Sequence, residues 1–190
     1  ADQDPLAVDR VRFVGEEVAA VAATDRYILE EALGLIRVDY EPLPAVFDPE
    51  EAMQPGAPEI HPSHPLVKEP FCNIAGKTES QWGDVKLGFE VSDYVRQDRF
   101  ESHLRTHGYL EPQATVASFE PGGKLRVWTS SQGPFLKRAK LAKTLGLPQS
   151  AVRVSKAWVG GAFGGKIDLF THEFCASLLS IKTGRPVRIE

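Results

Sequence analysis

Apolar and polar positions alternate in two stretches of the chain, and a proline-rich segment separates them. In the N-terminal stretch, three short apolar runs predict strands at residues 11–14, 18–23 and 35–40. Asp25 is placed to cap a helix that runs to about Leu33. Asp48 followed by Pro49 predicts the start of a second, short helix. This stretch is typical of a small α/β unit.

The C-terminal stretch contains more elements of both kinds, so the sequence predicts an α+β fold. The predicted strands cover residues 92–103, 114–119, 125–130, 151–159 and 187–189. The predicted helices cover residues 84–90, 134–145 and 167–180. The second and third strands form a hairpin around Pro121 and two glycines. The chain starts without methionine and ends on a strand pattern, so we expect a fragment or a split subunit.

Five prolines between residues 54 and 70 predict an extended linker. His61 and His64 lie three positions apart in it and suggest a metal site. A proline-rich chain gives two imidazoles no fixed geometry, however, and no cysteine or carboxylate cluster accompanies them. The prediction is therefore a solvated linker.

The composition excludes several classes of protein. A net charge of -4 disfavours nucleic-acid and membrane-surface binding, and no apolar run approaches the roughly 20 residues of a membrane span. The first residues are neither basic nor apolar, so no signal peptide is expected. Cys72 and Cys175 are unclustered and too few for an iron–sulfur cluster, which usually needs about four thiolates. They are expected to be buried thiols in a cytoplasmic protein.

A glycine run, GGAFGGK at residues 160–166, lies between a predicted strand and a predicted helix. Glycines allow a backbone to approach a ligand closely, and N–H groups at a helix start can bind anions. The spacing of Gly160, Gly165 and Lys166 fits most of a phosphate-binding P-loop. Ile167 stands where that motif needs a hydroxyl for magnesium. A P-loop-like nucleotide-binding domain is therefore kept as an alternative.

GGAFGGK resembles the GGGFGGK signature of the xanthine dehydrogenase and aldehyde oxidase family of molybdenum hydroxylases. Other stretches resemble the family in the same order: VRFVGEEVAAVA (11–22), VDYEPLPAV (38–46), NIA (73–75), GDV (83–85), HGYLEP (107–112) and WTSSQ (128–132). Residues 92–100 also resemble the 4-hydroxybenzoyl-CoA reductase branch. The resemblance implies the end of an α/β hammerhead domain (1–54), a linker (55–80) and the first part of a molybdopterin-binding α+β domain (81–190).

The resemblance also implies a site without a metal-coordinating side chain. The cofactor is molybdopterin or molybdopterin cytosine dinucleotide with molybdenum, and Gln132 donates to a molybdenum oxygen. The loop residues expected at the cofactor are Gly161, Ala162, Phe163, Gly164 and Gly165. Phe163 and Gly164 approach the apical oxygen through their N–H groups. The expected partners are the remaining molybdenum-subunit segments, a [2Fe–2S] subunit and a flavin (FAD) subunit.

No catalytic residue is expected in this chain, because the family's glutamate base lies near the end of a much longer subunit. The chain alone is expected to be inactive, and a small subunit that completes a partner's cofactor site is an alternative. Glu111 is expected to support the fold, and Lys166 either binds an anion or is solvated at a helix start. Xanthine-oxidising members carry a glutamate where Ile167 stands. An aldehyde, an aromatic heterocycle or an aryl-CoA therefore fits better than a purine.

Overall fold

The computed structural model of the chain describes residues 4–61, 73–74 and 76–190. Internal contacts group the chain into two units. One runs to Asp39 and resumes at Thr106, and the other spans Tyr40–Arg105. The predicted domains, 1–54, 55–80 and 81–190, do not coincide with these two units, and their boundaries stay a prediction.

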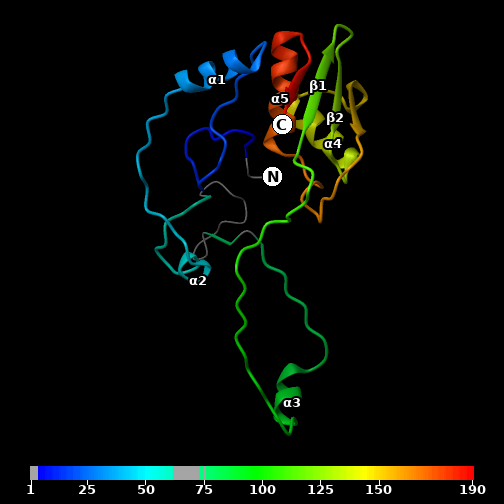
Figure 1. Cartoon of the computed structure of the whole chain (residues 1–190). Coiled ribbons are helices and arrows are strands. Elements are labelled where there is room, and N and C mark those ends of the chain that lie inside the picture. Colours follow the sequence, from blue (N-terminus) through cyan, green and yellow to red (C-terminus); the bar gives the residue numbers. More distant parts are fainter. Residues whose placement is uncertain (1–3, 62–72, 75) are drawn as a thin grey trace. The chain divides into compact units, whose positions relative to one another are not determined.

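A four-stranded sheet forms the centre of the C-terminal part (Figure 1). Its strand order is β3 (Val152–Lys156), β2 (Lys124–Thr129), β1 (Thr115–Glu120) and β4 (Val187–Ile189). β1 pairs antiparallel with β2 and with β4, whereas β2 and β3 are parallel. A parallel pair needs a crossover connection, which α4 (Pro134–Leu145) and the short 3-10 helix η1 (Gln149–Ala151) provide. The predicted hairpin is confirmed.

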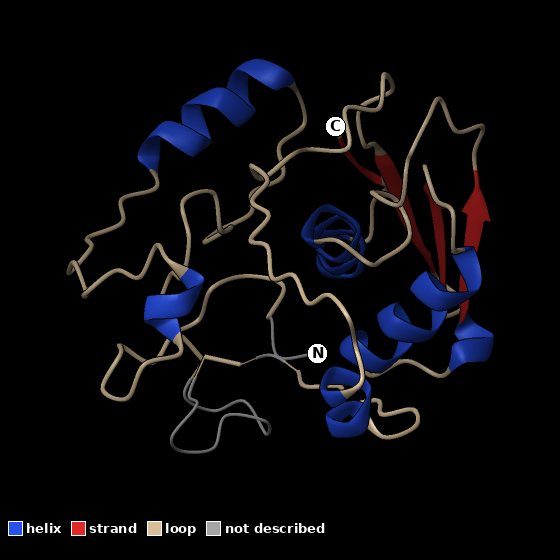
Figure 2. Cartoon of the chain, turned by 90° about the horizontal axis from the view of Figure 1, so that it is seen from below, coloured by secondary structure: helices blue, strands red, loops and turns tan. Residues whose placement is uncertain are grey.

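Two helices, α4 and α5 (Thr171–Thr183), cover one face of this sheet (Figure 2). Along β2, Leu125, Val127 and Thr129 are buried while the residues between them are exposed, as expected for a sheet with one solvated face. The buried core comes from the strands and both helices: Ala117, Leu125, Val127, Leu141, Ala142, Val152, Ala176 and Val187. The result is a two-layer α+β arrangement.

The predicted boundaries of two elements in this part, β3 and α5, are wrong by three residues or more. β3 ends at Lys156 rather than at residue 159, because its pairing with β2 ends where Lys156 meets Thr129. α5 begins at Thr171 rather than at residue 167, because the Glu173 carboxylate accepts the Phe170 N–H at 2.9 Å and caps the helix there. α4 matches its prediction, with a proline in the first turn and Gly146 in the left-handed conformation at its end.

The residues before Tyr40 contain the predicted helix but none of the predicted strands. α1 spans Arg26–Leu35, and the side chain of Asp25 accepts the N–H of Ile28 at 3.0 Å. Residues 11–14, 18–23 and 35–40 are not strands in the structure. A strand needs a neighbouring strand for its ladder of hydrogen bonds, and no described segment pairs with these three.

The unit Tyr40–Arg105 contains two short helices, α2 (Pro49–Ala52) and α3 (Val85–Glu90). Both were predicted, and the side chains of Asp48 and Asp84 cap them. The predicted strand at 92–103 is wrong, because this segment is exposed and pairs with no described strand. Within the linker prediction, His64 and Cys72 lie outside the described residues.

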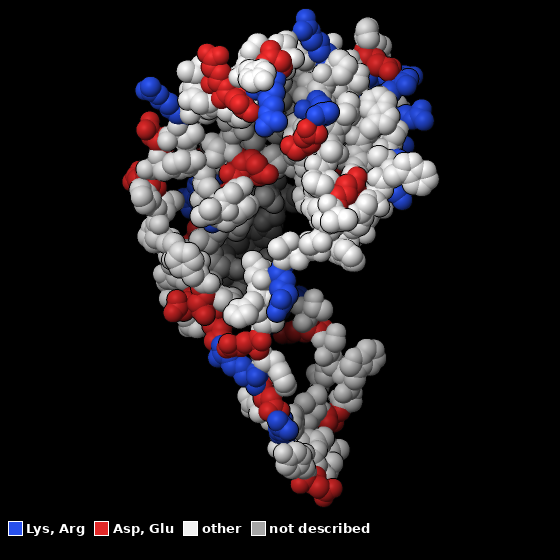
Figure 3. Space-filling view, viewed as in Figure 1, with Lys and Arg blue, Asp and Glu red and all other residues white. Residues whose placement is uncertain are grey.

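Acidic and basic side chains are intermingled on the face shown in Figure 3, in keeping with the small net charge of -4. None of the helices in the described ranges has both the length and the apolar character needed to cross a bilayer.

Candidate functional site

The glycine loop packs tightly against the segment that carries His107, Tyr109 and Glu111. A Cβ atom on Gly165 would lie 2.8 Å from Cε1 of Tyr109 and 3.0 Å from the ring of His107. A Cβ atom on Gly160 would lie 2.8 Å from the Cβ of Glu111. These two glycines are therefore required by packing within the chain, and not only by a ligand.

The middle of the loop has an unusual backbone. Gly161, Phe163 and Gly164 have φ values of +94°, +49° and +90°, and Phe163 is the one non-glycine residue with positive φ in the described ranges. A left-handed conformation costs a non-glycine residue roughly 1–2 kcal/mol. Such conformations turn consecutive N–H groups outward, as in the backbone nests that bind anions.

Several N–H groups of this loop have no acceptor. The loop closes on itself through Gly165 N–H to Ala162 O at 2.8 Å. The N–H groups of Ala162, Phe163 and Gly164 donate to no acceptor in the part of the chain that the structure describes. Since α5 starts only at Thr171, these donors belong to the loop itself and not to a helix N-terminus, as the sequence had suggested.

Gln132 follows β2 and lies beside the end of the glycine loop. Its backbone N–H donates to Lys166 O at 3.0 Å, and its side-chain Oε1 accepts the Lys166 N–H at 3.3 Å. The side chain is exposed, and its Nε2 donates to none of the described residues. The structure thus brings the predicted glutamine and the predicted loop together.

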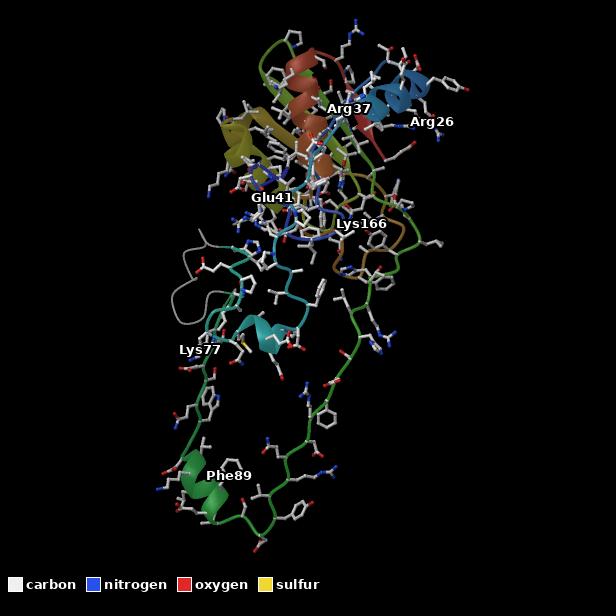
Figure 4. The ribbon with its side chains drawn as sticks, turned by 90° about the vertical axis from the view of Figure 1, so that its left-hand side faces the viewer. Arg26, Arg37, Glu41, Lys77, Phe89 and Lys166 are labelled. Atoms are coloured by element: carbon white, nitrogen blue, oxygen red, sulfur yellow. The ribbon has the colours of Figure 1, made fainter. Side chains whose placement is uncertain are left out.

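Lys166, which is labelled in Figure 4, is fully buried. It is paired with Glu111. Its Nζ donates to Glu111 Oε2 at 2.8 Å and to Glu111 O at 2.9 Å, and lies 4.7 Å from the centre of the Tyr109 ring. Glu111 also accepts Ser130 Oγ at 3.0 Å and Gly160 N–H at 2.7 Å. Of the two roles predicted for Lys166, solvation at a helix start is wrong, because the side chain is fully buried, and anion binding by a ligand stays a prediction that the pairing with Glu111 disfavours. The fold-supporting role of Glu111 is confirmed.

The sequence had not assigned His107, Tyr109 and Ser130 to this site. A signal for two of them was present in HGYLEP, where His107, Tyr109 and Glu111 alternate along an extended segment and can face the same side. Their contacts with Gly165 and Gly160 have that geometry. Ser130 carried no comparable signal.

The pKa of Glu111 is held below its usual value of 4.5, mainly by the hydrogen bond from Lys166 and then by that from Gly160 N–H. A carboxyl group with a lowered folded-state pKa stabilises the fold fully above about pH 4.5, and the stabilisation is lost as the pH falls through the lowered value. Glu111→Gln should therefore flatten the dependence of unfolding free energy on pH in the acid range. Urea titrations at several pH values measure this, and equal slopes for the two proteins would contradict it.

Comparison with known proteins matches this geometry to a family. The family model for the molybdopterin cofactor-binding domain matches residues 67–190. The model for the a/b hammerhead domain of aldehyde oxidase and xanthine dehydrogenase matches residues 1–44.

Individual relatives are similar over nearly the whole chain. The nicotinate dehydrogenase large molybdopterin subunit of Eubacterium barkeri is 37% identical over 99% of this chain and 42% of that subunit. A probable xanthine dehydrogenase subunit of Bacillus subtilis is 36% identical over 99% of this chain and 24% of that protein. The crystal structure of a Cu,Mo-CO dehydrogenase superposes with a TM-score of 0.83 at 34% identity, over 98% of this chain and 24% of that one. The chain thus spans less than half the length of each, and it belongs to the xanthine dehydrogenase and aldehyde oxidase family of molybdenum enzymes, with that family's molybdopterin cofactor-binding domain.

Proposed function

We propose that this chain forms one wall of the cofactor site in a molybdenum hydroxylase or dehydrogenase. The observation that supports it best is the grouping of unused donors. Gln132 Nε2 and the N–H groups of Ala162, Phe163 and Gly164 have no acceptor among the described residues, and Gln132 is hydrogen-bonded to Lys166 at the end of the same loop. Grouped donors of this kind are available to acceptor atoms of a ligand, and Gln132, Phe163 and Gly164 are exposed enough for a ligand to reach them.

The donors suit a molybdenum cofactor, because its oxygen ligands accept hydrogen bonds and need no added charge. When bound, the cofactor supplies two-electron redox chemistry at molybdenum. Gln132 donates from its amide, and Ala162, Phe163 and Gly164 donate through their backbone N–H groups, while the absence of a side chain on Gly164 leaves room for the ligand. Phe163 exposes 76% of its surface and can pack against the cofactor or the substrate. The pterin is molybdopterin or its cytosine dinucleotide.

The remaining functions are proposed to lie elsewhere in the assembly. The Glu111 carboxylate accepts from Lys166, Ser130 and Gly160, so it is a poor candidate for the catalytic base. The base belongs to other segments of the molybdenum subunit. Electrons pass to [2Fe–2S] and FAD centres on other segments or subunits, in a cytoplasmic complex. The chain alone, supplied with cofactor, should therefore show no substrate-dependent dye reduction.

For the substrate, we propose an aldehyde, an aromatic heterocycle or an aryl-CoA. The relatives are named for nicotinate, xanthine and CO. Ile167 is 45% exposed, lies beside Gly133, and offers no hydrogen bond to a purine. Dye reduction by the native assembly should therefore occur with benzaldehyde, nicotinate or 4-hydroxybenzoyl-CoA, and not with xanthine. Turnover of xanthine at the highest rate would contradict this choice.

Analysis of the purified native assembly also tests the proposed function without a substrate. Intact mass of the native protein with its co-purifying chains, together with its molybdenum content, should show stoichiometric molybdenum. A native protein without molybdenum would overturn the proposal. A separate catalytic chain that holds the base would identify this one as the small subunit that completes a partner's site.

The P-loop alternative is expected to fail in a binding experiment. The ammonium of Lys166 is buried against Glu111, and Ile167 provides no oxygen for magnesium. ATP or GTP with magnesium should therefore bind the chain no more tightly than about millimolar. Isothermal calorimetry measures this, and micromolar, magnesium-dependent binding would restore the nucleotide-binding hypothesis.

A further inference from the structure

The amide of Gln132 has one accepting end and one donating end, and its orientation decides which end a ligand meets. Its Oε1 accepts the Lys166 N–H at 3.3 Å. If the amide turned over, its NH2 group would face that N–H, and two donors would oppose each other. A lost hydrogen bond costs about 1 kcal/mol, which corresponds to a preference of about fivefold. The main chain of Lys166 thus selects the orientation in which the NH2 group of Gln132 points away from it.

The position of this main chain depends in turn on the Lys166 side chain. Its fully buried ammonium is anchored to both the carboxylate and the carbonyl of Glu111, at 2.8 and 2.9 Å. Glu111 is fixed by Ser130 from the end of β2 and by Gly160 at the start of the loop. Lys166 and Glu111 therefore join the segment of Glu111, the end of β2 and the glycine loop, and Lys166 is the residue among them that contacts Gln132.

We propose that Lys166 and Glu111 are positioning residues, whose ion pair sets the main chain of Lys166 and thereby aims the NH2 group of Gln132 at the ligand. The inference rests on the proposed function, in which Gln132 donates to an oxygen of the cofactor. Lys166 is fully buried, so it does not meet the ligand directly, and the proposal assigns its effect to Gln132, which its main chain contacts.

The first test needs neither cofactor nor substrate. In the ¹⁵N-labelled 190-residue chain, the side-chain amide signal of Gln132 is assigned by its loss in Gln132→Ala. Lys166→Met keeps the length of the apolar stem and removes the ammonium, and Glu111→Gln removes the other charge. Both should lower the order parameter of the Gln132 amide towards the flexible range, below about 0.6. Lys140→Met, which removes an exposed ion pair with Asp168, should leave it unchanged.

An amide that keeps its wild-type order parameter in both variants would overturn the proposal. If Lys166→Met does not fold, Glu111→Gln decides the matter, because its amide oxygen can still accept the Gly160 N–H while its NH2 group can donate to Ser130 Oγ. Melting temperatures measured alongside separate a local loss of order from a general loss of stability.

The second test uses the molybdenum-loaded native assembly and a double-mutant cycle. Lys166→Met should lower kcat about fivefold or more with little change in KM, and should lower it no further when Gln132 is already alanine. Additive losses would show a merely structural role for Lys166 and would reject the inference. Wild-type turnover in Gln132→Ala itself would reject the proposed function instead, so the two failures are distinguishable.

Discussion

Lys137→Met is expected to destabilise the chain by about 3–5 kcal/mol, because it leaves a charged carboxylate buried without its partner. Lys137 and Glu173 join α4 to α5, and their side chains are 1% and 0% exposed. Glu173 also accepts Thr129 Oγ1 at 2.7 Å and the Phe170 N–H at 2.9 Å. Urea unfolding followed by circular dichroism measures the loss of unfolding free energy.

The chain offers a matched control for this substitution. Lys140, three positions after Lys137 on α4, forms an ion pair with Asp168. The side chains of this pair are 40% and 58% exposed. Lys140→Met should cost less than about 1 kcal/mol, since solvent screens an exposed pair. Adding Glu173→Gln to Lys137→Met should recover much of the loss, because the buried charge disappears while the amide oxygen can still accept the Phe170 N–H and the NH2 group can donate to Thr129 Oγ1. Equal losses in the two single lysine variants would refute the argument.

Gln132→Ala should lower turnover of the loaded assembly about 10–100-fold and leave the fold intact. The fold should survive because the side chain is exposed and its amide makes one hydrogen bond, at 3.3 Å, with the described residues. Turnover falls because the cofactor loses a donor that the backbone of Lys166 holds in place. Steady-state kinetics with the preferred substrate measures the effect.

Gln149→Ala serves as the control, because Gln149 is also exposed and also makes one side-chain contact, with Arg138 at 3.3 Å. It lies in η1, away from the glycine loop in sequence, and its substitution should leave turnover unchanged. Full activity in Gln132→Ala, or equal losses in both variants, would remove Gln132 from the site.

Elements with local signals were predictable from the sequence. The hairpin turn, the proline at the start of α4 and the glycine at its end lie within a few residues of the structure they determine. The predicted cap Asp25 and the predicted helix start at Asp48 are equally local, and both side chains accept N–H groups of the helix that follows.

Features that depend on distant residues were not predictable in the same way. The apolar runs before Tyr40 have strand composition but lack a partner in the described chain. The start of α5 is fixed by Glu173, whose carboxylate also accepts hydrogen bonds from Thr129 on β2 and Lys137 on α4. Lys166 lies 55 positions from Glu111, so no spacing rule could pair them. The motif resemblance predicted Gln132 and the loop as site residues, whereas the contacts that hold them together are visible only in the three-dimensional structure.

Because Lys166 is fully buried, the rate at which its amine reacts with a reagent in solution reports how often the site opens locally. An acylating reagent reacts with a lysine only when solvent reaches it, and Lys124, which is exposed, would be modified at once. The ratio of the modification rates of Lys166 and Lys124 then measures how rarely the Lys166 side chain separates from Glu111. Lys137 is 1% exposed, and its modification rate in the same reaction measures how often α4 separates from α5. Mass spectrometry of one quenched time course would therefore record the two openings separately.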